Sequence, residues 1–281
     1  ALFVSINNPH DIYKFKRHEP GARQIALPPS WEGESFDGKP PIQKQFMEAD
    51  QGKAIVGKPR AEWERYHDCY REKTRLYDKH VGVILDELKR QGQWENTIVI
   101  VTSDHGDMDA QHKLIFKGPF MYEHMVRVPL MIRVPERFGG SDGKRVADAD
   151  IVNVDIVPTL RELCGMPAKP SHGLSLAPLL TGEGDYQARD FVVGQYYSKQ
   201  RWVNPIRMIR TEEFKLNRHI RWGDELYDLE KDPHELKNLA DEPAYVAIKE
   251  GLVQKLDRWI SDHADPFYSL DVTTRSGKAL A

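Results

Sequence analysis

Several residue patterns that mark large classes of protein are absent from this sequence. It has two cysteines among 281 residues, Cys69 and Cys164, which stand far apart, form no metal-ligand pair and leave a disulfide open. No apolar run reaches the roughly 18 residues that suggest a membrane span. Because 40 basic residues nearly balance 43 acidic ones and no basic tract stands out, we expect neither a nucleic acid nor an anionic membrane as partner.

The chain also lacks the usual features of an N-terminus. It begins Ala1-Leu-Phe-Val-Ser-Ile-Asn, with neither an initiator methionine nor a signal-peptide pattern. We therefore expect a C-terminal segment of a longer protein, whose targeting information lies outside these residues. With 40% hydrophobic content the chain is long enough to bury a substantial core, in one large domain or one plus a small one.

Periodicity predicts alternating helices and strands over the first two thirds of the chain. The expected elements are a short buried strand at 2–6, a functional loop or lid at about 14–57, a helix at 60–92, strands at 97–102 and 127–134, and a helix at 153–164.

The composition turns polar and glycine-rich at residues 181–188, which predicts a boundary. Two domains are expected, at 1–183 and 184–281. The second should hold an antiparallel sheet, because short alternating runs follow one another at 190–197, 206–211, 214–220 and 225–228. A helix with one apolar face is expected at 244–263.

The most informative stretch is the β-branched run that starts at Thr97 and ends in Ser103-Asp104-His105-Gly106. A strand there would deliver two side chains to its C-terminal end, where open α/β sheets build their ligand sites. The carboxylate and the imidazole can reach one divalent cation, which would hold and polarise a sulfate or phosphate oxygen. The alternative is an aspartate that caps the next helix beside an incidental histidine.

Two further residues have suitable chemistry for such a site. Lys117 lies in Phe-Lys-Gly-Pro, and a lysine on a loop near a metal can bind an oxyanion and stabilise charge on a leaving oxygen. His10 follows a strand-like run and Pro9, and a histidine can donate a proton to a departing alkoxide. The alternatives are a solvated surface lysine, as we expect for nearby Lys113, and a loop histidine without a role.

Taken together, these runs resemble the second half of a type I sulfatase, a member of the alkaline-phosphatase-like superfamily. The shared features are Ser-Asp-His-Gly after a strand, the run from Phe116 to Glu123, Arg-Val-Pro-Leu from Arg127, and Pro-His after the first strand. The resemblance implies an α/β sulfatase sandwich with a mostly parallel central sheet. A small C-terminal subdomain of antiparallel sheet and helix would follow it.

The resemblance also implies roles for single residues. Asp104 and His105 would ligate Ca²⁺, with Mg²⁺ as the alternative, because imidazole is softer than such cations prefer. Lys117 would bind the sulfate, and His10 would contact it and protonate the leaving group, although Asp-Ile-Tyr follows His10 where many relatives keep a second proline. His112 would contact substrate or support the site, with a purely structural role as the alternative.

The chemistry of residues farther along the chain suggests weaker roles for them. Tyr122, Glu123 and Arg127 would hold their loop to the core through a charge pair. Three residues near the start of the second domain would line a polar substrate pocket, with plain packing or solvation as the alternative: Trp202, Arg207 and Arg210.

The family's nucleophile motif is missing from this sequence. Sulfatases oxidise the first residue of Cys/Ser-x-Pro-Ser-Arg to formylglycine, and the nearest string here, Cys164-Gly-Met-Pro, lacks the spacing and the arginine. An early strand with paired acidic residues is also absent. Both belong to the N-terminal half in this family, so the expected protein is a sulfuric ester hydrolase present without that half and inactive alone.

The expected substrate is a sulfated carbohydrate or small molecule, and the family is typically periplasmic, secreted or lysosomal. Two alternatives stay open: a phosphate or phosphonate ester hydrolase of the same superfamily, and a non-catalytic fragment that binds sulfated glycans. The sugar, the sulfated position and the oligomeric state stay open as well.

Overall fold

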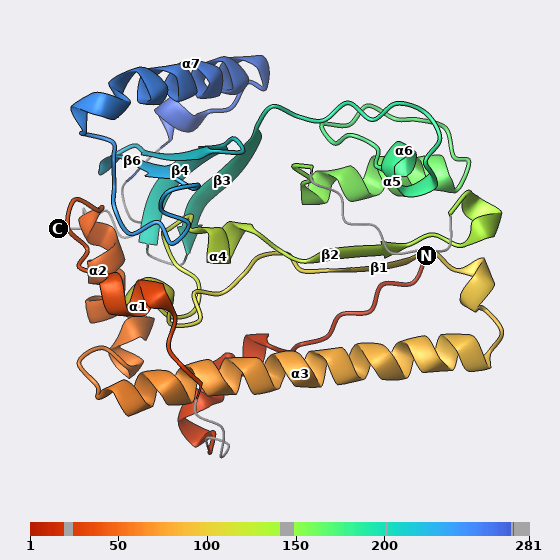
Figure 1. Ribbon diagram of the computed structural model, residues 1–281, viewed down its shortest axis with the longest axis horizontal. Coiled ribbons are helices and arrows are strands. Elements are labelled where there is room, and N and C mark those ends of the chain that lie inside the picture. The colour runs from red at the N-terminus through yellow and green to blue at the C-terminus, as the bar shows by residue number, and fades with distance from the viewer. Residues whose placement is uncertain (20–24, 141–148, 200–201, 271, 273–281) are drawn as a thin grey trace. The chain divides into compact units, whose positions relative to one another are not determined.

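The computed structural model describes residues 1–19, 25–140, 149–199, 202–270 and 272 (Figure 1). Its helices are α1 Pro29–Gly33, α2 Pro41–Ala49, α3 Arg60–Arg90, α4 Glu123–Val126, α5 Ile156–Leu163, α6 Ala177–Thr181 and α7 Val246–Asp262. Its strands are β1 Val99–Thr102, β2 Leu130–Arg133, β3 Val192–Lys199, β4 Trp202–Arg210, β5 Phe214–His219 and β6 Gly223–Asp228. The helices predicted at 60–92, 153–164 and 244–263 and the later strands are confirmed.

The chain forms two compact units, and neither is a continuous stretch of sequence. The first unit comprises Ala1–Arg75, His105–Arg127 and Val193–Ala281, and the second comprises Leu76–Asp104 and Val128–Val192. The domain boundary predicted after residue 183 stays a prediction. None of the described helices has a stretch long and apolar enough to cross a membrane.

The first unit is built on a four-stranded sheet in the order β3-β4-β5-β6. β5 pairs antiparallel with β4 and with β6, with Met208 opposite Asn217 and Asn217 opposite Glu225. Figure 1 shows α7 along one face of this sheet, where its Leu252 and Leu256 are buried. The loop after β1 and α2 lie on the other face, so β4 is buried along nearly its whole length.

An aromatic core fills the first unit below the sheet. Phe46 of α2, Tyr66 of α3 and Phe120 are almost completely buried. The apolar positions of α3 that enter this core, Trp63 and Tyr66, stand three residues apart and therefore share one helix face.

The segment at about 14–57, predicted as one functional loop or lid, is not a continuous loop. The segment contains α1 and α2, and Ile42 and Phe46 of α2 are fully buried. Its prolines read as loop residues, but Pro29 and Pro41 stand at the first positions of α1 and α2. Proline is favoured there because its fixed φ suits a helix and its missing N–H is not needed.

The second unit contains an antiparallel pair of strands. β1 and β2 align Val99 with Arg133 and Thr102 with Leu130. α5 ends as predicted at Gly165, which takes a φ of 64° and donates its N–H to the carbonyl of Glu162.

The mostly parallel central sheet is not found among the described residues. Where the structure defines strand register, every pair is antiparallel. A parallel pair needs a crossover connection, usually helical, that returns the chain to the same end of the sheet. The chain between β1 and β2 instead passes through His105–Arg127 of the first unit.

The buried strand predicted at residues 2–6 is also wrong. These residues form no strand, and the side chains of Leu2 and Phe3 are 86% and 89% exposed. An extended segment becomes a strand only when a neighbour satisfies its backbone N–H and C=O groups. The described residues provide no such neighbour for this segment.

Candidate functional site

The chain leaves β1 through a turn that requires glycine. A Cβ atom on Gly106 would lie 1.8 Å from the carbonyl oxygen of His124. The N–H of Gly106 donates to the carbonyl of Met125 at 2.8 Å, which ties the start of this loop to α4. Gly106 therefore fixes how the chain continues from Asp104 and His105.

Asp104 and His105 are consecutive, so covalent geometry keeps their backbones about 3.8 Å apart. Asp104 is exposed just beyond the end of β1. The Nδ1 atom of His105 lies 2.8 Å from the carbonyl oxygen of Gly106. Because a carbonyl only accepts, Nδ1 carries the hydrogen, which leaves the lone pair of the neutral ring on Nε2.

This arrangement suits part of a metal site. Metal-bound histidines often donate from one ring nitrogen to a backbone carbonyl and ligate through the other. Among the described residues no three His, Cys, Asp or Glu side chains form a cluster able to hold a metal ion. The role of Asp104 and His105 as metal ligands therefore stays a prediction.

The loop that follows is held in an unusual backbone conformation. Five of its non-glycine residues have positive φ values between 43° and 69°: Asp109, Ala110, His112, Lys113 and Phe116. Each such residue costs about 1–3 kcal/mol and persists only when surrounding contacts enforce it. Such strain is typical of functional loops, and here it lies directly before Lys117.

Tyr66 of α3 is one of the groups that enforce this conformation. Its hydroxyl donates to Oδ1 of Asp107 at 2.8 Å and accepts from the N–H of Phe116 at 2.9 Å. The N–H of Met108 donates to the carbonyl of Phe116 at 2.9 Å, which closes the same loop. Both ends of the loop are thus fixed by one fully buried hydroxyl.

A second contact from α3 holds the middle of the loop. Nε of Arg71 donates to Nε2 of His67 at 3.1 Å, so the hydrogen of the neutral His67 ring lies on Nδ1. That nitrogen donates to Asp109 at 2.9 Å. Burial raises the pKa of Asp109 to about 6, although the hydrogen bond from His67 works in the opposite direction.

His112 lies in the interior of the first unit. Its side chain is almost completely buried, and its ring stacks on Tyr122 with centroids 3.8 Å apart. Its Nδ1 lies 2.5 Å from a carboxylate oxygen of Glu34, which also accepts from Lys39 at 2.6 Å. This placement favours the structural role that the sequence left open over contact with substrate.

The same cluster should make the fold sensitive to acid. Burial lowers the pKa of His112 to about 4 from its usual 6.5, so the unfolded chain takes up a proton there before the folded one does. The pKa of Glu34 is also lowered, with His112 and Lys39 favouring its charged form against burial. Both groups bind protons more weakly when folded, so stability is lost as pH falls.

Between pH 7 and about 4.5 we expect the free energy of unfolding to fall by roughly 2–3 kcal/mol through His112. His112→Asn, which tolerates a positive φ, should show a smaller fall, because the titrating group is gone. Denaturant titrations at several pH values measure this. Exposed His80→Gln serves as control and should keep the wild-type fall; an unchanged fall in His112→Asn would exclude the assignment.

Lys117 and His10 are brought together from positions far apart in the sequence. The Nζ atom of Lys117 lies 2.9 Å from Nδ1 of His10. An ammonium only donates, so Nδ1 is the acceptor and the hydrogen of the neutral imidazole lies on Nε2. His10, at the start of the 3₁₀ helix His10–Arg17, is exposed, and Lys117 is half-buried.

Two residues that the sequence did not single out hold the backbone on either side of Gly118. Lys199, at the end of β3, donates to the carbonyl of Lys117 at 2.6 Å. Asn204 of β4 donates to the carbonyl of Pro119 at 3.2 Å. A lysine and an asparagine in strands carry no local sequence feature that would have identified them.

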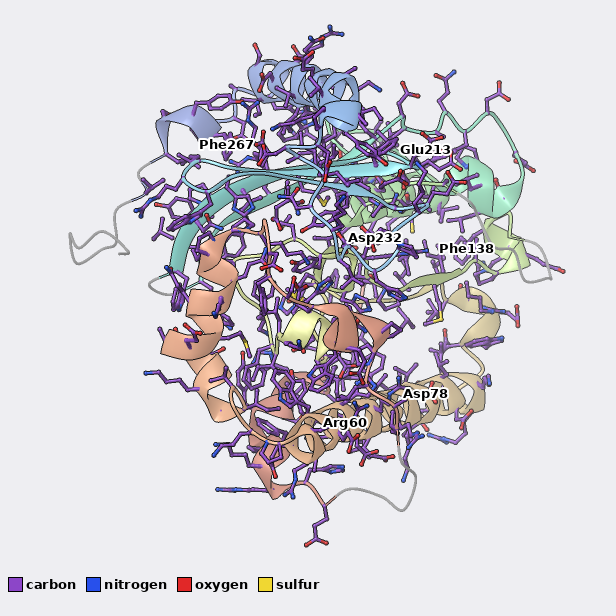
Figure 2. All side chains as sticks on the ribbon, turned by 60° about the vertical axis from the view of Figure 1, so that its left-hand side comes forward. Arg60, Asp78, Phe138, Glu213, Asp232 and Phe267 are labelled. Carbon is purple, nitrogen blue, oxygen red and sulfur yellow. The ribbon has the colours of Figure 1, made fainter. Side chains whose placement is uncertain are left out.

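The substrate-pocket roles expected for Trp202, Arg207 and Arg210 are not supported. Trp202 is buried and its indole N–H donates to Asp50. Arg207 pairs with Asp265 at 2.6 Å and lies over the ring of Phe267, which Figure 2 labels beside the sheet. β4 is buried from Trp202 to Ile209, and the half-buried Arg210 pairs with Glu123.

Two smaller expectations need correction. Glu123 does form a charge pair, but its partners are Arg210 at 3.3 Å and Lys215 at 3.1 Å. Lys113 is not a solvated lysine, because its Nζ donates to the carbonyl of Glu34 at 2.6 Å. Lys113 is therefore unsuitable as a control for Lys117.

Comparisons with known proteins agree with the resemblance seen in the sequence. The family profile described as Sulfatase matches residues 1–166, and the profile described as N-sulphoglucosamine sulphohydrolase, C-terminal, matches residues 111–262. The chain belongs to the sulfatase family. It covers a C-terminal portion of its relatives.

Among curated relatives, a Delta 4,5-hexuronate-2-O-sulfatase of Bacteroides thetaiotaomicron is 31% identical over 96% of this chain and 58% of the relative. An N-acetylglucosamine-6-O-sulfatase of the same organism is 30% identical over 76% of this chain and 38% of the relative. The chain thus spans little more than half the length of the first of these relatives and less than half the length of the second.

Solved structures show the same relationship. A putative sulfatase from Bacteroides thetaiotaomicron matches with a TM-score of 0.87 and 28% identity, over 95% of this chain and 60% of that one. A phosphonate monoester hydrolase of Agrobacterium radiobacter matches with a TM-score of 0.74 and 26% identity, over 96% of this chain and 58% of that one. The fold is sulfatase-like.

Proposed function

We propose that these residues supply the oxyanion-binding and leaving-group side of a sulfuric ester hydrolase that acts on sulfated carbohydrate. The contact between Lys117 and His10 is the observation that carries the proposal. Family membership and the two carbohydrate sulfatases among the relatives support it. Because the chain covers 58% of the relative with the longest match, we expect the activity to need a longer, full-length protein.

The contact has a direct chemical use. When the ester oxygen departs, Nε2–H of His10 can donate its proton to that oxygen while Nδ1 takes a proton from the ammonium of Lys117. The C–O oxygen gains one hydrogen, Lys117 loses one, and the imidazole ends as the opposite neutral tautomer. An alcohol is a far weaker acid than an ammonium, so this transfer is favourable as soon as the S–O bond has broken.

Before that transfer, Lys117 has a second task. Its ammonium can donate to a non-bridging sulfate oxygen, on which negative charge is held throughout the reaction. A cation placed in advance stabilises such charge without reorganising in the transition state. Because an ammonium has three N–H donors, contact with His10 and contact with the sulfate are compatible.

In the same protein, Asp104 and His105 would supply two of the ligands of a divalent cation. A bound Ca²⁺ or Mg²⁺ would supply Lewis-acid polarisation of a sulfate oxygen. Carboxylate oxygen suits both ions, and the hydrogen on Nδ1 of His105 leaves Nε2 as the ligating atom. The remaining ligands and the nucleophile are proposed to lie outside these residues.

Hydrolysis of phosphate or phosphonate esters is the second candidate. The likeness to a phosphonate monoester hydrolase at 26% identity favours it over other classes. The two ester types present similar tetrahedral oxyanions, so Lys117 and His10 would serve either one. Substrate preference must therefore be measured.

The test is a substrate panel assayed with the full-length protein. It should contain sulfated hexuronate and glucosamine derivatives, nitrophenyl sulfate and a phosphonate monoester. We expect the sulfated sugars to give the highest kcat/KM and Asp104→Ala to abolish turnover. A preference for the phosphonate would select the second candidate, and binding of sulfated sugar without any turnover would select a non-catalytic glycan binder.

The 281-residue chain alone is expected to show no sulfatase activity, because its sequence lacks the nucleophile motif and its described residues form no complete metal shell. The measurement is turnover of nitrophenyl sulfate with added calcium. Calcium-dependent turnover by this chain, lost in Asp104→Ala, would show that the described residues contain a whole active site. A second preparation from an independent expression should exclude a contaminating sulfatase.

A further inference from the structure

We propose that Lys199 is a positioning residue for the pair of Lys117 and His10, holding the backbone of Lys117 by a hydrogen bond and adding a second positive charge to the same anion-binding site. The inference rests on the proposed function, because it assigns Lys199 to the same anion-binding site. It also extends that site from the loop after β1 to the end of β3.

The hydrogen bonds of Lys199 fix its head group in one place. Nζ donates to the carbonyl of Lys117 at 2.6 Å and to Oε1 of Gln51 at 2.7 Å. The ammonium also lies 5.5 Å from the centroid of the Phe46 ring. Two separate segments of the first unit, residues 46–51 and the loop that carries Lys117, therefore meet at Lys199, and the second carries the proposed sulfate-binding lysine.

The backbone beside Lys117 is closely packed and is held by hydrogen bonds on both sides of Gly118. A Cβ atom on Gly118 would lie 2.6 Å from the ring of Phe120, so the chain passes tightly through this point. Asn204 holds the next carbonyl, that of Pro119, from β4. Because the sheet holds the chain on both sides of Gly118, the direction in which Lys117 leaves the backbone depends on Lys199.

The charges around Lys199 indicate that it also contributes positive charge to the site. Burial and then the nearby charge of Lys117 lower the pKa of Lys199 to about 8. Asp107 and Asp50 face it as well and favour its charged form. The positive charges of Lys199 and Lys117 repel each other, which is one cause of the lowered pKa of Lys199, and a bound anion would relieve that repulsion. The arrangement therefore suits a site that receives an anionic ester.

A purely structural lysine would behave differently as the pH rises. A neutral amine still has two N–H groups, so deprotonated Lys199 can keep both of its hydrogen bonds. Only the positive charge is lost as the pH passes about 8. If Lys199 serves the anion, KM for a sulfate ester should rise over this range while the folded structure is unchanged.

The experiment compares Lys199→Met, Lys199→Arg and the control Lys44→Met in the full-length protein. Lys44 is an exposed lysine of α2 that pairs with Glu48. We expect Lys199→Met to lower kcat/KM by roughly 10–100-fold, the scale of one charge-assisted hydrogen bond. Lys44→Met should match the wild type. Equal activities of these two variants would overturn the proposal.

The pH profile separates charge from structure. In the wild type, KM should rise above pH 8, and in Lys199→Arg this rise should disappear, because arginine keeps its charge. A rise that persists in Lys199→Arg belongs to another group and would also overturn the proposal. Thermal unfolding of all variants identifies any loss of fold.

A spectroscopic readout keeps the inference separate from the proposed function. The tautomer of His10 can be followed by ¹⁵N NMR of the imidazole, and we expect Nδ1 to be the acceptor in the wild type. Lys199→Met should alter that signal, whereas Lys44→Met should not. A protein inactive on every ester but showing this response would refute the function and keep the positioning role; no response would refute the role.

Discussion

Lys117→Ala is expected to lower kcat/KM for sulfate esters by about 10²–10³-fold in the full-length protein, the scale seen when one charge-stabilising donor is lost. The variant removes both the ammonium that we propose binds the sulfate and the proposed proton source for Nδ1 of His10. The second loss matters more when the leaving alcohol is a weak acid. The deficit should therefore be larger for sulfated sugars than for nitrophenyl sulfate.

Lys44→Ala is the matched control, because Lys44 lies on the surface of α2 in the same unit. Steady-state assays on both substrate types measure the effect. If Lys117→Ala and Lys44→Ala were equally mild, the assignment of the run Phe116–Glu123 to an anion site would fail. If Lys117→Ala lowered kcat/KM by the same factor for both leaving groups, the result would support the anion site and exclude the proton relay.

The local part of the fold was predictable from the sequence. The β-branched run before Asp104 forms β1, and the apolar spacing around Trp63 and Tyr66 forms the buried face of α3. In these elements a short-range pattern decides the structure, because the same residues both form the element and provide its buried face. The alternating runs beyond residue 190 formed an antiparallel sheet for the same reason.

Strand pairing and burial were less predictable, because they depend on residues far away in sequence. The parallel sheet was inferred from family resemblance, but nothing in β1 specifies the direction of its neighbour. Trp202 was expected to line a pocket because of its chemistry alone, yet β4 is buried from Trp202 to Ile209. Residues 2–6 read as buried because of their composition alone.

In the candidate site, too, the contacts between residues far apart in the sequence were the part that could not be predicted. Lys117 and His10 lie 107 positions apart, and only the resemblance to sulfatases suggested that they belong together. The role of His112 could not be decided from the sequence for the same reason. Its buried partner Glu34 lies 78 positions away, and nothing in the sequence around His112 indicates that contact. The contact of Lys199 with Lys117 could not be predicted, because a lysine at a strand end carries no sequence feature that indicates its partners.

His10→Ala is expected to produce the second large loss, and its dependence on the leaving group should be steeper than that of Lys117→Ala. A positioned acid or base contributes typically 10²–10⁴-fold, so kcat/KM for a sulfated sugar should fall by about that factor. For nitrophenyl sulfate the fall should be small, because nitrophenolate departs without protonation. The measurement is a plot of log kcat/KM against leaving-group pKa for both proteins.

His10→Gln distinguishes the relay from simple hydrogen bonding. Glutamine can place an N–H donor near the position of Nε2, but it cannot pass on a proton from Lys117. If His10 only orients the leaving oxygen, His10→Gln should recover much of the lost activity. If the proton comes from Lys117 through the ring, His10→Gln should stay close to His10→Ala on sulfated sugars. A shallow plot in His10→Ala itself would mean that the histidine does not protonate the leaving group, and the contact with Lys117 would then serve only to orient the lysine.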